Sequence, residues 1–246
     1  AVIGNTPAES PLRRLGKKGG ATAYAPSIKP EDLKKITSGP EVLKPGEVGI
    51  GRMIPDVAFT DLAGKSYRLS DSRKGTLIIM TSATCPVSKR ALPSLVALDA
   101  SLQAQGLTLI LINPYASETP ADIQAQLQAA GYHGLYVHDK DMALCRALGA
   151  RTTTEVFLLD ATRTLLYRGA LDDQYGTNYN REAPRHTYLK DAVTDFLAGR
   201  AVTTGATSAP GCELDLGPKP TATPTQVTYY RDVARILQQN AEDKGL

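Results

Sequence analysis

Leu77-Ile-Ile-Met-Thr-Ser-Ala-Thr-Cys-Pro-Val-Ser-Lys-Arg90 is the stretch that decides the fold of this chain. The apolar run Leu77–Met80 stops at small polar residues, and apolar residues at helical spacing begin at Ala91. A short β-branched apolar run is typical of a buried strand, and the later spacing is typical of an amphipathic helix. The pattern therefore predicts a buried strand that leads directly into a helix.

Cys85 falls at the predicted junction between this strand and this helix, with Pro86 directly after it. Proline is favoured in the first helical turn, where its missing N–H costs nothing. Unpaired N–H groups and the helix dipole favour a thiolate at this position, and Lys89 and Arg90 add positive charge one turn later. We therefore predict a reactive cysteine, the alternative being the inert, half-buried thiol that most free cysteines are.

Composition limits the kinds of partner. The chain has 246 residues, 42% of them hydrophobic, which is enough for a sizeable core. Its net charge is only +3, so no basic field predicts a nucleic acid or an anionic membrane as partner. No apolar run approaches the roughly 18 residues of a membrane-spanning helix.

Changes in composition predict three segments. Residues 1–48 are rich in Gly, Pro and Lys without a sustained apolar period, which indicates an extended basic arm. Residues 49–215 carry the strand and helix patterns of one compact domain. Residues 216–246 begin with a proline-rich linker and end with an amphipathic helix over Val227–Asn240.

Within the compact domain, hydrophobic periodicity and turn residues predict alternating strands and helices. We expect a hairpin over 57–69 that turns at Gly64, strands at 77–80, 107–112, 135–137, 155–159 and 165–169, and helices at 86–105, 119–131, 139–148 and 187–198. This order implies an α/β fold whose central mixed sheet is flanked by helices, with parallel pairs first and an antiparallel hairpin last.

That order, with a cysteine after the first core strand, resembles the thioredoxin-fold redoxins. The resemblance is closest to a peroxiredoxin-like bacterial subgroup of the AhpC/TSA group. The matching stretches are Gly51–Lys65, Thr84-Cys85-Pro86-Val87-Ser88, Glu155–Asp160, Tyr167–Asp173, Asp191–Gly199 and Gly211-Cys212. It implies a thiol oxidoreductase in which Cys85 is the nucleophile.

The chain also departs from that pattern. Ser88 stands where a Cys-x-x-Cys pair has its second cysteine, so Cys85 cannot form the adjacent disulfide. Ser82 takes the place of the threonine in the peroxidase motif, and Ile78 the place of its proline. Thr154 stands where thioredoxins have a cis-proline and peroxiredoxins an arginine that polarises the peroxide. We therefore expect weak peroxidase activity or none, unless Arg151 or Arg168 supplies the missing charge.

The predicted catalytic residues are Cys85, Thr84, Ser82, Thr154 and Cys212. The helix-start amides and Thr84 are expected to stabilise the thiolate. The hydroxyls of Ser82, Thr84 and Thr154 are candidate donors to the leaving oxygen of a peroxide. Cys212 follows the last helix of the domain and is the candidate resolving thiol. Cys145, near the apolar stripe of its helix, is expected in the core.

Two other classes of function stay open from the sequence. Thioredoxin-fold copper carriers use soft thiolates, and here only Cys85, Cys212 and His186 could combine for such a site. The chain could also be a non-catalytic module of a larger electron-transfer assembly, joined through its C-terminal helix. No Cys-x-x-Cys-His haem signature follows that helix, and we predict neither a cofactor nor a bound metal.

The expected partner is a protein that carries a thiol or a disulfide, with a larger redox complex as a further expectation. The chain opens with Ala1 rather than Met. Together with the habit of the family it resembles, this leads us to expect a periplasmic or secreted bacterial protein whose signal has been removed.

Overall fold

The computed structural model describes residues 38–217 of the chain. Most of the predicted basic arm and the predicted C-terminal helix lie outside the described residues. The helices and strands of the described part are β1 (Ala58–Thr60), β2 (Ser66–Arg68), β3 (Gly75–Met80), α2 (Pro86–Ala104), β4 (Thr108–Asn113), α3 (Pro120–Ala130), β5 (Leu135–His138), α4 (Ala143–Leu148), β6 (Val156–Asp160), β7 (Leu165–Gly169) and α5 (Tyr188–Leu197), with short 3-10 turns at Pro45–Val48 and Leu69–Asp71.

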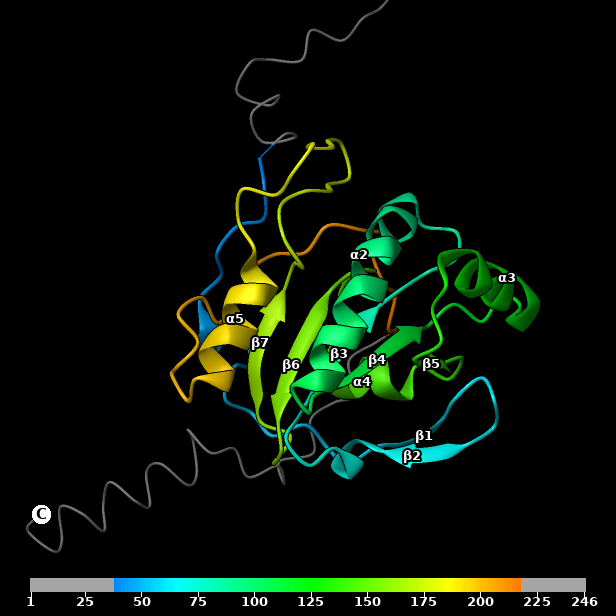
Figure 1. The fold of residues 1–246 in the computed structure, drawn as a ribbon, viewed down its shortest axis with the longest axis horizontal. Coiled ribbons are helices and arrows are strands. Elements are labelled where there is room, and N and C mark those ends of the chain that lie inside the picture. Colours follow the sequence, from blue (N-terminus) through cyan, green and yellow to red (C-terminus); the bar gives the residue numbers. More distant parts are fainter. Residues whose placement is uncertain (1–37, 218–246) are drawn as a thin grey trace, which may run out of the picture. The chain divides into compact units, whose positions relative to one another are not determined.

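Five strands form one mixed sheet in the order β5-β4-β3-β6-β7 (Figure 1). The pairs β3–β4 and β4–β5 are parallel, whereas β3–β6 and β6–β7 are antiparallel. Strand β3 is therefore central, and all six of its residues are buried. The predicted α/β class with a central mixed sheet and flanking helices is confirmed, and the carboxyl end of β3 delivers the chain to Cys85.

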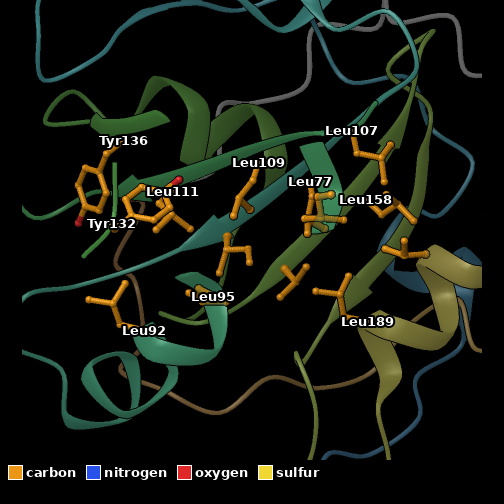
Figure 2. Packing of buried hydrophobic residues seen from close by; sticks show 14 of the residues in the cluster. Leu77, Leu92, Leu95, Leu107, Leu109, Leu111, Tyr132, Tyr136, Leu158 and Leu189 are labelled. Carbon is orange, nitrogen blue, oxygen red and sulfur yellow. The ribbon is translucent and has the colours of Figure 1, made fainter. Parts of the chain in front are cut away.

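Alternate residues of the central strands enter two separate cores. Leu77 and Leu109 face the side covered by α2, α3 and α5 (Figure 2). Ile78 and Ile110 face the opposite side, where α4 and the β1–β2 hairpin cover the sheet. A strand that is buried on both faces reads as a continuous apolar run, which explains why the segment before Cys85 has no polar alternation.

Helix α4 is shorter than its sequence pattern predicts. We expected it from residue 139, but it begins only at Ala143. Met142 adopts a left-handed conformation with φ 53°, which is incompatible with an earlier helical turn. The Asp139 carboxylate instead accepts hydrogen bonds from the N–H groups of Leu144 and Cys145, so it acts from outside the helix as an anion at its N-terminus.

The end of the predicted arm packs against the domain. Val42 pairs with Thr207 in an isolated antiparallel bridge, and the N–H of Leu43 donates to the carbonyl of Ala206 at 3.0 Å. The chain around residues 41–43 thus contacts the segment that follows α5. Across residues 38–217, no helix has the length and apolarity that a membrane span requires.

Candidate active site

Cys85 is the N-cap residue of α2, with an extended backbone (φ −68°, ψ 121°) and Pro86 at the first helical position. Its side chain is only 3% exposed. The sequence predicts this placement from local signals alone, because β3 ends at Met80 and the proline fixes the start of the helix. The thiol therefore lies at the positive end of a 19-residue helix.

The structure brings Cys212 onto Cys85. The Cys212 thiol donates to Cys85 Sγ across 3.1 Å, and the two residues are 127 positions apart in the sequence. Thr153 joins both cysteines: its hydroxyl donates to Cys85 Sγ at 3.2 Å, and its oxygen accepts from the N–H of Cys212 at 2.9 Å. Both cysteines are free thiols. A disulfide requires sulfurs about 2.05 Å apart, so an approach of about 1 Å would join them.

The environment shifts the pKa values of the two thiols in opposite directions. Burial acts to raise the pKa of Cys85, but hydrogen bonds from the Thr153 hydroxyl, the Ser88 N–H and Cys212 outweigh it, so the pKa is lowered. The pKa of Cys212 is raised, first because its thiol is engaged as a donor to Cys85 and then by burial. The pair is therefore polarised, with Cys85 as the sulfur that ionises first.

Gly211 allows Cys212 to approach. Its φ of 127° lies outside the range that L side chains readily adopt, and a Cβ at this position would lie 2.0 Å from the carbonyl oxygen of Thr153. The backbone of Thr153 also donates to the carbonyl of Cys212 at 2.9 Å. Glycine is therefore required before Cys212 for a steric reason, since only glycine lets the backbone at residue 211 lie this close to the backbone of Thr153.

A buried carboxylate holds the loop before Cys85. Glu118, only 5% exposed, accepts hydrogen bonds from the hydroxyls of Ser82 and Thr84, from the N–H groups of Ala83 and Thr84, and from the side-chain amide of Asn113. Burial acts to raise its pKa, but these donors lower it to about 2. Glu118 is thus an anion that fixes the loop from residue 82 to residue 84.

The hydroxyls of Ser82 and Thr84 are engaged away from the sulfur, so the expectation that Thr84 stabilises the thiolate through its hydroxyl is wrong. The Thr84 hydroxyl donates to Glu118 at 2.6 Å. The Ser82 hydroxyl also donates to Glu118, and its oxygen accepts from the N–H of Cys85 at 3.0 Å. Each hydroxyl donates its hydrogen to the buried carboxylate of Glu118 and so helps to fix the loop, because hydrogen bonds to a charged acceptor are strong.

Ser88, which replaces the second cysteine of a Cys-x-x-Cys pair, also fixes this loop. Its buried hydroxyl accepts from the N–H of Ser82 at 2.9 Å. Its own N–H is one of the donors that lower the pKa of Cys85. The serine therefore supplies a hydrogen bond to the sulfur through its backbone, where a second thiol would have supplied a reaction partner.

Thr154 does not face the sulfur, contrary to expectation. Its φ of 69° turns the chain, its N–H donates to the carbonyl of Met80 at 2.7 Å, and its hydroxyl donates to the carbonyl of Pro210 at 2.6 Å. Thr154 thus anchors the segment that carries Cys212. The neighbouring Thr153 makes the contact with Cys85, because the turn at Thr154 directs consecutive side chains to different places.

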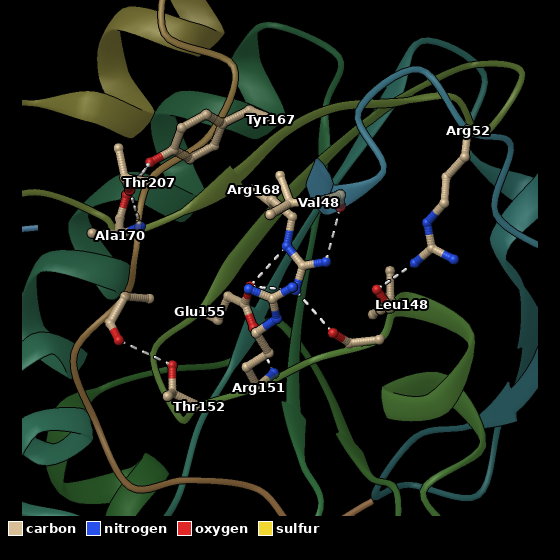
Figure 3. Close-up of polar contacts among 12 residues, drawn as sticks. Val48, Arg52, Leu148, Arg151, Thr152, Glu155, Tyr167, Arg168, Ala170 and Thr207 are labelled. Atoms are coloured by element: carbon tan, nitrogen blue, oxygen red, sulfur yellow. Dashed lines mark hydrogen bonds and ion pairs between the residues drawn. The ribbon is translucent and has the colours of Figure 1, made fainter. Parts of the chain in front are cut away.

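Of the two arginines proposed as substitutes for the missing peroxide-binding arginine, Arg168 has its guanidinium held elsewhere. Arg168 forms a buried ion pair with Glu155 at 2.6 Å and also donates to the carbonyls of Val48 and Gly149 (Figure 3). The backbone N–H of Arg151 donates to the second oxygen of Glu155 at 2.6 Å, while its side chain is exposed. The expectation that Arg168 could turn toward the sulfur is therefore wrong.

The third cysteine and the candidate metal ligand are separate from this pair. Cys145 is fully buried beside Met80, and burial raises its pKa, which confirms the core assignment. His186 pairs through Nδ1 with Asp173 at 3.1 Å. Between residues 38 and 217 no group of three His, Cys, Asp or Glu side chains could hold a metal ion. The copper alternative therefore lacks a third His, Cys, Asp or Glu ligand in this part of the chain.

Sequence reasoning missed Thr153 and Glu118. Glu118 comes just before the threonine that caps α3, and its surroundings in the sequence resemble those of an ordinary surface acid. Thr153 is one of three consecutive threonines, 152 to 154, and nothing local distinguishes the one that faces Cys85. Only the folded structure identifies these two residues, Thr153 through its contact with Cys85 Sγ and Glu118 through its bonds to the loop before Cys85.

Comparison with known proteins relates the central part of this chain to a family. Residues 50–168 match the model of the AhpC/TSA family. A curated relative, the thiol-disulfide oxidoreductase ResA of Geobacillus thermodenitrificans, is 26% identical over 114 residues. That alignment covers 46% of this chain and 64% of the relative, so the chain spans just under two thirds of its length.

Solved structures show the same fold. A hypothetical protein from Sinorhizobium meliloti superposes with a TM-score of 0.61 at 25% identity, covering 73% of this chain and 98% of that one. An uncharacterized conserved protein from Geobacillus kaustophilus gives 0.60 at 26% identity, covering 70% and 94%. A putative thiol:disulfide interchange protein DsbE from Chlorobium tepidum gives 0.50 at 19% identity, covering 60% and 97%. With the mixed sheet and the family match taken together, residues 50–168 are a thioredoxin-fold redoxin region of the AhpC/TSA family.

Proposed function

We propose that this protein catalyses thiol–disulfide exchange, with Cys85 as the nucleophile and Cys212 as the resolving thiol. The observation that carries the proposal is the 3.1 Å contact between the two sulfurs in the reduced protein. Exchange requires an accessible thiolate and a second thiol close enough to displace the partner. The lowered pKa of Cys85 and the position of Cys212 meet two of these requirements.

The proposed reaction has two displacements. The Cys85 thiolate attacks one sulfur of a partner disulfide; a Cys85–partner bond forms, and the second partner sulfur leaves as a thiolate with the electron pair of the broken bond. Cys212, after losing its proton to solvent, attacks Cys85 Sγ and displaces the remaining partner thiolate. The partner gains two electrons, and the Cys85–Cys212 pair becomes a disulfide. A second dithiol reverses these steps, and the reduction potentials of the partners set the direction.

Access to the pair comes from the Cys212 side. Cys85 is almost fully buried, whereas Cys212 is exposed. A protein disulfide therefore reaches Cys85 only when the segment that carries Cys212 moves aside. This movement requires the breaking of the hydrogen bonds that hold the segment. They run from Thr152 and Thr154 to the carbonyls of Ala209 and Pro210, and between the backbone of Cys212 and Thr153.

Weak or absent peroxidase activity is part of the proposal. Peroxide cleavage requires donors or a cation that stabilise the departing oxygen. Arg168 is tied to Glu155, and Thr154 occupies the position of the arginine in the peroxidases. The proposal further includes an extracytoplasmic location, since disulfides persist in oxidising compartments. It also includes a redox complex formed through the helix that the sequence predicts at the C-terminus.

Peptide mapping tests the proposal directly, because trypsin places each cysteine in its own peptide: Gly75–Lys89, Asp141–Arg146 and Ala201–Arg231. After oxidation with diamide, the first and third peptides should be recovered as one disulfide-linked species. Cys85→Ser should abolish exchange with a small aromatic disulfide. Cys212→Ser should accumulate the mixed disulfide on Cys85.

Cys145→Ala provides the matched control, since it removes a thiol that the mechanism does not use. The proposal is refuted if Cys85→Ser exchanges as fast as the native protein, or if oxidation joins Cys85 to Cys145 or to neither cysteine. Hydrogen peroxide consumption that matches the exchange rate would refute the peroxidase part alone. Recovery of the native protein from bacterial cells with the cytoplasmic fraction would refute the proposed location.

A further inference from the structure

The hydroxyl of Thr153 lies between the two cysteines. Thr153 is fully buried, at 0% exposure. Its Oγ1 is 3.2 Å from Cys85 Sγ and 2.9 Å from the backbone nitrogen of Cys212. In the other direction, the N–H of Thr153 donates to the carbonyl of Cys212 at 2.9 Å. One residue thus contacts the nucleophilic sulfur and holds the backbone of the resolving residue at two points.

The partners of this hydroxyl determine where its hydrogen points. A backbone N–H can only donate, so the contact with Cys212 uses a lone pair of Oγ1. The single hydroxyl hydrogen is then left for Cys85 Sγ. An oxygen that accepts one hydrogen bond becomes a better donor in the next, because neighbouring bonds polarise each other. Formation of the Cys212 contact therefore strengthens the hydrogen bond to the sulfur.

We propose that Thr153 is a catalytic residue of the exchange reaction, whose hydroxyl stabilises Cys85 Sγ as a thiolate. The inference rests on the proposed function. It applies to both half-reactions, because Cys85 is a nucleophile in one and a leaving group in the other. In the reverse direction a partner thiolate attacks Cys85 Sγ and displaces Cys212. The second partner thiolate then attacks the partner sulfur of this mixed disulfide, the partner disulfide forms, the Cys85–partner bond breaks, and its electron pair stays on Cys85 Sγ.

Other donors limit the size of the effect. The N–H of Ser88 and the helix dipole also favour the thiolate. Loss of the Thr153 hydroxyl should therefore raise the pKa of Cys85 without abolishing its reactivity. A hydrogen bond to a charged group typically changes such an equilibrium by about tenfold or more, so we expect a rise of about one pH unit.

Replacement of Thr153 by valine, alanine and serine separates the hydroxyl from the bulk of the side chain. In the full chain, alkylation of Cys85 is followed against pH through the Gly75–Lys89 peptide, independently of the other two thiols. The midpoint of the plot of alkylation rate against pH gives the apparent pKa of Cys85. The plateau rate at high pH also depends on how easily the reagent reaches the sulfur. Thr153→Val should raise the midpoint by about one pH unit, and Thr153→Ser should keep it within about 0.3 of the native value.

The alanine variant serves the same purpose as valine if the valine protein does not fold. Thr81→Val is the matched control, because it removes a buried hydroxyl whose bonds go to the carbonyl of Ile112 and to Tyr136. Its Cys85 midpoint should equal that of the native protein.

Equal midpoints in the native and hydroxyl-free proteins would overturn the assignment of Thr153, as would equal rises in the serine and valine variants. Disulfide mapping of the native protein in the same series distinguishes this outcome from failure of the proposed function. If native Cys85 still pairs with Cys212 and exchanges, only the role of Thr153 is lost. If the native pair does not form, the exchange mechanism fails with it.

Discussion

Replacement of Glu118 by glutamine should destabilise the fold by about 3 kcal/mol at neutral pH. Its carboxylate lies in the loop before α3 and accepts five hydrogen bonds, four of them from residues 82–84. Burial opposes its charge, yet the donors lower its pKa from 4.5 to about 2. At about 1.4 kcal/mol per pH unit, this difference corresponds to about 3 kcal/mol of stability.

The glutamine variant leaves two donors unsatisfied. In the native protein, Oε2 accepts from the N–H of Ala83 and from the side-chain amide of Asn113, both at 2.6 Å. An NH2 group at that position cannot accept either bond. Each buried donor without an acceptor costs about 1–3 kcal/mol, which agrees with the value obtained from the pKa.

The pH dependence follows from the direction of the shift. A carboxylate with a lowered pKa in the folded protein stabilises the fold above its unfolded pKa of 4.5, and this contribution is lost as the pH falls toward 2. The native protein should therefore lose about 3 kcal/mol through this group between about pH 5 and pH 2. The Glu118→Gln protein should lack this component.

Urea unfolding followed by far-ultraviolet circular dichroism is the appropriate assay, because the chain has no tryptophan. With a slope of about 2 kcal/mol per molar urea, the midpoint at pH 7 should fall by about 1.5 M. Glu47→Gln, an exposed residue that pairs with Lys44, should shift it by less than about 0.5 M. A Glu118→Gln midpoint within about 0.3 M of the native value, with an unchanged acid profile, would refute this account.

Three further replacements test other parts of the structure. Gly211→Ala should slow diamide-driven formation of the internal disulfide by at least about tenfold, because the new Cβ would collide with the Thr153 carbonyl 2.0 Å away; a native rate would contradict this. Cys145→Ala should cost about 1–2 kcal/mol in urea unfolding and leave exchange unchanged, and loss of exchange would show that its thiol participates. Arg168→Met should cost about 3–5 kcal/mol because Glu155 is left as an unpaired buried charge, and adding Glu155→Gln should restore more than half of the loss. Equal unfolding midpoints for the single and double variants would show that the ion pair is not the cause.

Local signals in the sequence predicted the framework of this protein. The apolar run before Cys85 became β3, and Pro86 marks the first turn of α2 as expected. Thr119 caps α3 through its side chain, as its threonine–proline sequence predicts. These features depend on neighbours within a few residues, because strand periodicity and helix capping are local interactions. The start of α4 was placed four residues too early, since periodicity does not reveal the left-handed residue at Met142.

The site itself was decided by the tertiary structure. The sequence identified Cys85 and Cys212 as candidates, but only folding brings residues 127 positions apart to 3.1 Å. The sequence pointed to Thr154 as a residue of the site. In the structure the chain turns at Thr154, and Thr153 makes the hydrogen bond to Cys85 Sγ. Long-range approach depends on packing of the whole sheet, and side-chain direction in a turn depends on backbone dihedral angles that composition does not specify. The sequence therefore determined where the reactive sulfur lies, and the fold determined which groups surround it.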